Sequence, residues 1–110
     1  MDIVISKSDN KNKKYQVVID NKKTIHFGDS QYQDFTTHKD KDRKRLYIAR
    51  HKKNENFGIS GVDTAGFWSK NSLWNKDTLT KSVDDINKNI KVSILNYNKY
   101  EFNYILNGTI

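Results

Sequence analysis

The chain has 110 residues, a net charge of +7 and only 35% hydrophobic residues. A chain of this length forms about one domain with one modest core, so we expect a single domain over residues 1–110. Cysteine is absent, which excludes disulfides, thiolate metal ligands and cysteine nucleophiles. The sequence has no apolar run near the roughly 20 residues that span a bilayer and no secretory signal at its start, so we expect an intracellular protein that does not use a membrane.

The first quarter of the chain has the pattern of β-strands. Residues 3–5 can start a short strand, and residues 15–27 alternate apolar and polar side chains along two arms of a hairpin. Asp20 and Asn21 can adopt the positive φ that a tight turn requires. Gly28 is expected to end the second arm, and the next eight residues are expected to be irregular.

The most basic segment, residues 39–53, reads KDKDRKRLYIARHKK and contains eight Lys or Arg and two Asp. It therefore holds six of the seven net positive charges. We expect a helix here, with Thr37 as its N-cap and Asp40 completing a capping box three residues later. Its apolar stripe is narrow, so most of its circumference should face water or a ligand.

Two further helices are expected after the basic segment. Residues 65–75 are predicted to form a short helix or a helical turn, and a longer helix should begin at Asp77 or Thr78. Four apolar side chains of this longer helix recur at helical spacing and should therefore be buried. They are Leu79, Val83, Ile86 and Ile90.

The end of the chain is predicted to form a second hairpin, over residues 91–106, and its strands could pair with a second copy of the chain. The fold class that follows is α+β. We expect a small antiparallel β-sheet, with hairpins near 15–27 and 91–106, packed against two or three helices.

The concentrated charge predicts a polyanionic partner, because such a surface attracts polyanions and binds them in a salt-dependent way. Our first hypothesis is a non-enzymatic protein that binds nucleic acid, DNA or RNA, with little sequence specificity. A second is contact with an acidic protein surface, and a third is that the charges only keep a helix face solvated. The residues expected to bind nucleic acid are Arg43, Lys44, Tyr47, Arg50, Lys52 and Lys53.

Several aromatic residues allow two interpretations. Trp68 and Trp74 can both anchor the core, which is the usual fate of large rings, or one of them can stack on a base. Tyr47 lies between two arginines on the predicted helix. It can donate a hydrogen bond to phosphate, or pack its ring and leave its hydroxyl in water.

A metal-dependent nuclease is a distant alternative. His51 and Glu55 are spaced to lie on one helix face, and His38 could join them in space. His38 and Asn54 are also residue types that a nuclease of the His-Asn-His kind uses. The spacing matches no established metal motif, so we expect no catalytic residues, no metal and no cofactor.

Three segments resemble a family of small proteins from large DNA viruses and some phages. They are VVIDNKKTIHFG, YQDFTTHKDKDRKRLYIARHKKNENF and GVDTAGFWSKNSLWNK, and the resemblance spans Tyr15 to Ile90. The family has no established activity, so the resemblance implies a viral origin rather than a mechanism. It implies a protein made inside an infected host cell, either free or packaged as a minor virion component. The last twenty residues fall outside the family pattern.

Overall fold

The structure, a computed structural model, describes residues 3–90 of the chain. The predicted hairpin at 91–106, the contact between copies that would use it, and the side chain of Ile90 lie outside the described part. Within residues 3–90, no helix combines the length and the apolar character that crossing a membrane requires.

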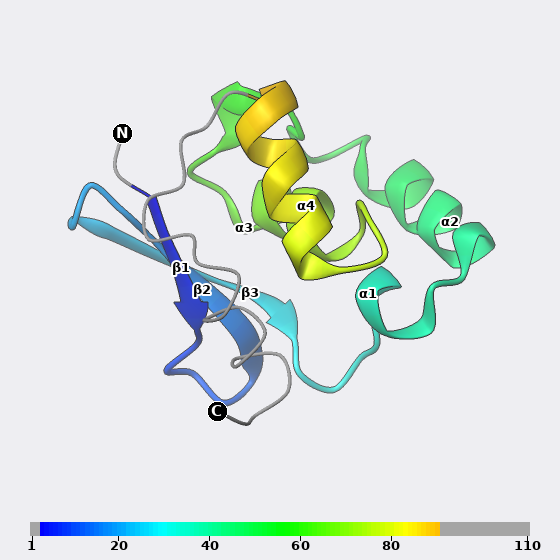
Figure 1. Cartoon of the computed structure of the whole chain (residues 1–110), viewed down its shortest axis with the longest axis horizontal. Coiled ribbons are helices and arrows are strands. Elements are labelled where there is room, and N and C mark those ends of the chain that lie inside the picture. The colour runs from blue at the N-terminus through cyan, green and yellow to red at the C-terminus, as the bar shows by residue number, and fades with distance from the viewer. Residues whose placement is uncertain (1–2, 91–110) are drawn as a thin grey trace.

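The predicted α+β class is confirmed, with a three-stranded antiparallel sheet and a helical layer (Figure 1). The strands are β1 (Ile3–Lys7), β2 (Lys13–Ile19) and β3 (Lys23–Asp29), in that order across the sheet. The α-helices are α1 (Phe35–His38), α2 (Lys41–His51), α3 (Ala65–Trp68) and α4 (Leu79–Asp85). A 3-10 turn, η1 (Ile59–Gly61), precedes α3, and the π-helical segments η2 (Ser69–Leu73) and η3 (Ile86–Ile90) extend α3 and α4.

The predicted first hairpin is confirmed. Asp20 and Asn21 form its turn with φ of 53° and 56°, the left-handed geometry that matches the twist of paired strands. The second arm continues one residue past its expected end, and Gly28 lies inside it with φ of 80°. A Cβ at Gly28 would lie 2.6 Å from Cδ1 of Leu73, so glycine lets η2 approach the sheet closely.

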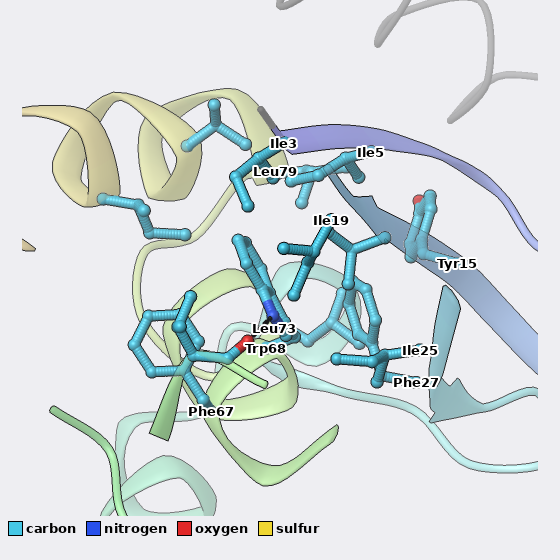
Figure 2. Packing of buried hydrophobic residues seen from close by; sticks show 14 residues of the cluster. Ile3, Ile5, Tyr15, Ile19, Ile25, Phe27, Phe67, Trp68, Leu73 and Leu79 are labelled. Carbon is cyan, nitrogen blue, oxygen red and sulfur yellow. Dashed lines mark hydrogen bonds between the residues drawn. The ribbon is translucent and has the colours of Figure 1, made fainter. Parts of the chain in front are cut away.

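The core lies between one face of the sheet and the helices α3 and α4 (Figure 2). The alternating residues of the strands supply one side, as with the fully buried Ile3 and Val17. The predicted apolar stripe of the last helix supplies the other, because Leu79, Val83 and Ile86 all have 0% of their surface exposed. The strand-period and helix-period patterns therefore meet in one core.

The predicted start of the basic helix is wrong. Asp34, not Thr37, caps a separate short helix, α1, by accepting a hydrogen bond from the Thr36 N–H at 2.9 Å. Lys39 then adopts φ of 56° and ends α1. Asp40 caps α2 itself, because its carboxylate accepts from the backbone of the next turn.

The expected low burial of the basic helix is confirmed, since no residue of α2 is buried. The helix lies at the edge of the molecule, away from most of the sheet (Figure 1). The helices α3 and α4, which cover the core, lie between α2 and the sheet (Figure 1). This placement leaves the charged side chains of α2 available on a large part of its circumference.

Candidate functional site

A column of four aromatic rings attaches α2 to the rest of the protein. The Tyr47 ring stacks on Trp74 with centroids 4.3 Å apart and planes 3° apart, and on His51 at 4.2 Å on its other side. His38, at the end of α1, contacts Trp74 at 5.2 Å. The column therefore runs from α1 through the end of η2 to α2.

The ring of Tyr47 is packed against other rings, as one of the two interpretations expected. Its hydroxyl does not simply face water. The hydroxyl forms a hydrogen bond with the Ser69 side chain. Burial, and next the negative charge of Glu55, raises the pKa of Tyr47 to about 12, so the phenol stays protonated at neutral pH. With both ring faces covered by protein, Tyr47 offers no face to a base.

Lys44 also holds α2 in place. Its ammonium donates to the backbone carbonyl of Asn75 at 2.6 Å and lies 5.0 Å from the centre of the Phe35 ring. Burial, and next the positive charges of Lys76 and Lys41, lowers the pKa of Lys44. The charge of Lys44 is thus directed toward the protein, so it is less available to a ligand than the other cations of the helix.

One flank of α2 borders a cleft of about 590 Å³, which we call the α2 cleft. The helix contributes the cationic Arg43 and Arg50 and the apolar Leu46 to this wall. The opposite wall comes from the end of β3 and the loop that follows it. The floor comes from η2 and its neighbours. The residues of the loop wall and floor that matter most here are Asp29, Tyr32, Gln33, Asp34, Leu73 and Trp74.

The other flank of α2 forms a more open depression of about 470 Å³. Its base is apolar, with Phe35, Ile48 and Ala49. Among the described residues, those that line it include no carboxylate. Its charged residues are Lys41, Lys44, Arg45 and Lys52.

The predicted binding residues are therefore divided between two surfaces. Arg43 and Arg50 lie on the α2 cleft, whereas Lys44 and Lys52 lie on the opposite flank. Lys53 follows the end of the helix and is exposed. A single positive surface on one helix face does not describe this arrangement, because positions 43 and 50 are about half a turn away from positions 41, 45 and 52 at 3.6 residues per turn.

Sequence reasoning missed several residues of these flanks. Lys41 and Arg45 are two of them, and their helical spacing to the predicted Lys52 is a signal that a helical wheel of the segment would have shown. Tyr32 gives no such signal, because it enters the cleft from a loop whose path depends on the turn after β3. Leu46 is apolar, yet 55% of its surface is exposed.

The two tryptophans have different environments. Trp68 is 0% exposed within the core, and its indole N–H donates to the Val62 carbonyl at 2.7 Å. Trp74 is half-buried and packs against the core from outside while it supports Tyr47. Trp68 is therefore a core residue, as one interpretation expected. Trp74 is only partly a core residue, because it joins the core to the basic helix.

The histidines do not come together. His51 Nδ1 lies 3.2 Å from Glu55 Oε2, as their spacing suggested. His38 lies at the other end of the ring column, with Trp74 and Tyr47 between them. Across residues 3–90, no group of three His, Cys, Asp or Glu side chains is placed to hold a metal ion. His38 therefore does not join His51 and Glu55, and these three side chains do not form the group that would have favoured a nuclease.

A family of unknown function, DUF5754, matches residues 3–51 of the chain. The match begins with β1 and ends with the last residue of α2, so it includes the sheet and the basic helix and leaves out α3 and α4. The chain is thus similar to this family over somewhat less than half of its length. No curated protein and no solved structure matches the chain.

Proposed function

We propose that the protein binds nucleic acid through the exposed cations of α2, mainly by contacts with phosphate and with little sequence specificity. The observation that carries the proposal is that these cations are free to meet a ligand. Within the described part of the chain, none of five cations forms an ion pair. They are Lys41, Arg43, Arg50, Lys52 and Lys53.

The chemistry of these groups suits phosphate. Arginine presents a planar fork of donors that matches the oxygens of a phosphate, and both arginines of the cleft flank project from a rigid helix. Contacts of this kind position a protein on a nucleic-acid backbone without reading the bases. The ring column and Lys44 hold the helix in place, so the backbone that carries the cations needs little ordering when a ligand binds.

The test is a paired charge removal. The Arg43→Gln, Arg50→Gln double variant removes two free cations from the cleft flank. We expect weaker binding to a short duplex and a plot of log affinity against log salt that is flatter by about one to two units, since each neutralised phosphate contributes about 0.9. Fluorescence anisotropy of labelled duplex at several salt concentrations measures both quantities.

A matched control removes the same charge elsewhere. Lys11 and Lys22 are exposed residues of the two strand turns, and their replacement by glutamine changes the net charge equally. This control should bind with nearly the wild-type affinity and slope. Equal losses in the two double variants would mean that only net charge matters, and unchanged binding in the folded arginine variant would overturn the proposal.

Contact with an acidic protein surface is tested in the same experiment by adding polyglutamate. If polyglutamate competes as well as nucleic acid does, the cations of α2 do not distinguish carboxylates from phosphates, and the preference for nucleic acid is wrong. The viral setting and the role in a virion stay predictions of the resemblance between the sequences.

A further inference from the structure

We infer that the α2 cleft receives one unstacked nucleotide of a single strand, with its phosphate against Arg43 and Arg50 and its base against Tyr32. This inference rests on the proposed function and adds a preference for single-stranded nucleic acid. It concerns a surface that the helix alone does not provide, because one wall of the cleft comes from the loop after β3.

The size and shape of the cleft suit one nucleotide. Its volume of about 590 Å³ lies within the roughly 300–1,000 Å³ of typical small-molecule sites. A single strand can turn a base into such a space, whereas the bases of a duplex are stacked and paired inside the helix. A duplex would therefore reach only the cations on the rim.

Charged side chains of both signs line the cleft, with Lys14, Asp29 and Asp34 outside α2 and two arginines on it. The α2 wall carries the two free guanidinium groups. On the loop wall, Asp34 is already used, because Lys14 Nζ donates to it at 2.6 Å and the start of α1 donates to it as well. Asp29 accepts from the Gln31 N–H through one oxygen, which leaves its other oxygen for a base amino group or a sugar hydroxyl.

The cleft also presents apolar surface that the protein itself leaves uncovered. Tyr32 has 70% of its surface exposed, and its ring contacts no other ring among residues 3–90. Leu46, on the facing wall, is 55% exposed. A base inserted between these walls would cover both side chains, and a tyrosine ring stacks on any base without reading its sequence.

An acidic peptide fits the same cleft less well. It would use the arginines, but its carboxylates would meet Asp29 on the facing wall with like charge. A nucleotide keeps its negative charge on the phosphate and presents donors and a flat ring at the other end. The free Asp29 oxygen opposite the arginines therefore favours a nucleotide.

The test compares a short oligothymidylate with a short duplex in binding to wild type and to Tyr32→Ala. The variant should fold normally, because the ring is mostly exposed. We expect its affinity for the single strand to fall about 5- to 150-fold, the range found when a base-stacking ring is truncated, and its affinity for duplex to stay unchanged. Quenching of Trp74 fluorescence by the single strand should accompany binding, because this ring lies on the floor of the cleft.

Ile59→Ala is the matched control. It removes another large exposed apolar side chain, 51% exposed, from the remote turn η1, and it should leave both affinities unchanged. Loss of single-strand affinity in this control as large as in Tyr32→Ala would overturn the inference.

The remaining outcomes separate this inference from the proposed function. If neither nucleic acid binds, both fail. If both bind and Tyr32→Ala has wild-type affinity for the single strand, phosphate binding by α2 stands and the nucleotide site is wrong. If free thymidine monophosphate competes as well as the single strand does, the preference for a strand is wrong and the cleft is a mononucleotide site. If Tyr32→Ala weakens the binding of polyglutamate as much as that of the single strand, the cleft is a peptide site.

Discussion

His38 is held in its neutral form by the groups around it. Its Nδ1 accepts a hydrogen bond from the backbone N–H of Asp40 at 2.9 Å, so the ring proton must be on Nε2. Nε2 is itself buried and has no partner among the residues that the structure describes. Burial, and next the positive charge of Arg43, lowers the pKa of His38, against the opposing effect of Asp40 and Asp34.

We predict that protonation of His38 destabilises the protein as the pH falls. In the unfolded chain the imidazole takes up its proton near pH 6.5, while the folded protein keeps it neutral to a lower pH. The unfolded state thus binds more protons below pH 6.5, and the free energy of unfolding decreases there. Above pH 6.5 both states hold a neutral ring, and His38 adds no pH dependence.

Urea denaturation between pH 5 and pH 8 measures this effect. The His38→Gln variant keeps a side-chain acceptor and cannot titrate, so the difference in unfolding free energy between wild type and variant should change with pH only below about 6.5. An NMR titration that gives His38 a pKa above 6.5 would contradict the prediction.

At the scale of the elements, the sequence predicted which helices and strands exist better than it predicted where each of them begins and ends. Tyr15, Val17 and Ile19 lie on one face of a strand, and this alternation and the periodicity of the last helix both arise from burial against one core, so each pattern has a direct structural cause. The start of α2 has no such cause. It depends on Lys39 in a left-handed conformation, which an ordinary side chain rarely adopts.

The candidate site was predictable in the same limited sense. The charge of residues 39–53 identified α2, because charge and helical spacing are both properties of one segment. The α2 cleft was not predictable, because it forms where that helix packs beside the loop after β3 and beside η2, and the pattern of one segment does not predict such packing. Lys44 shows the same limit, since its carbonyl partner belongs to Asn75.

The observed cap leads to a prediction at this scale. Asp40→Ala should lower the free energy of unfolding by about 1 kcal/mol, because it leaves backbone N–H groups of the first turn of α2 without their acceptor. Thr37→Ala is the matched control and should have little effect, because Thr37 is exposed and caps no helix. Denaturation curves in urea compare them, and a larger loss in Thr37→Ala would restore the helix start expected from the sequence.

The whole molecule has a core and an attached basic helix. The buried apolar cluster joins the sheet to α3, η2 and α4 (Figure 2). None of the residues of this cluster belongs to α2. The basic helix instead depends on Trp74, Tyr47 and Lys44, which lie at the border of that cluster. The core that stabilises the fold and the helix that we propose to bind nucleic acid are therefore different parts of the chain, and charge can accumulate on α2 without weakening the core.

This division predicts that α2 opens separately from the core. Trp74→Ala removes the ring that supports Tyr47 and contacts His38, so the helix loses the centre of its attachment. Hydrogen exchange of the amides in residues 41–51 should accelerate more than that of the amides in β2, because local opening requires less free energy than global unfolding. Trp74→Phe keeps a stacking ring and should show a smaller change. Equal acceleration in α2 and β2 in the alanine variant would show that the helix and the core unfold as one unit.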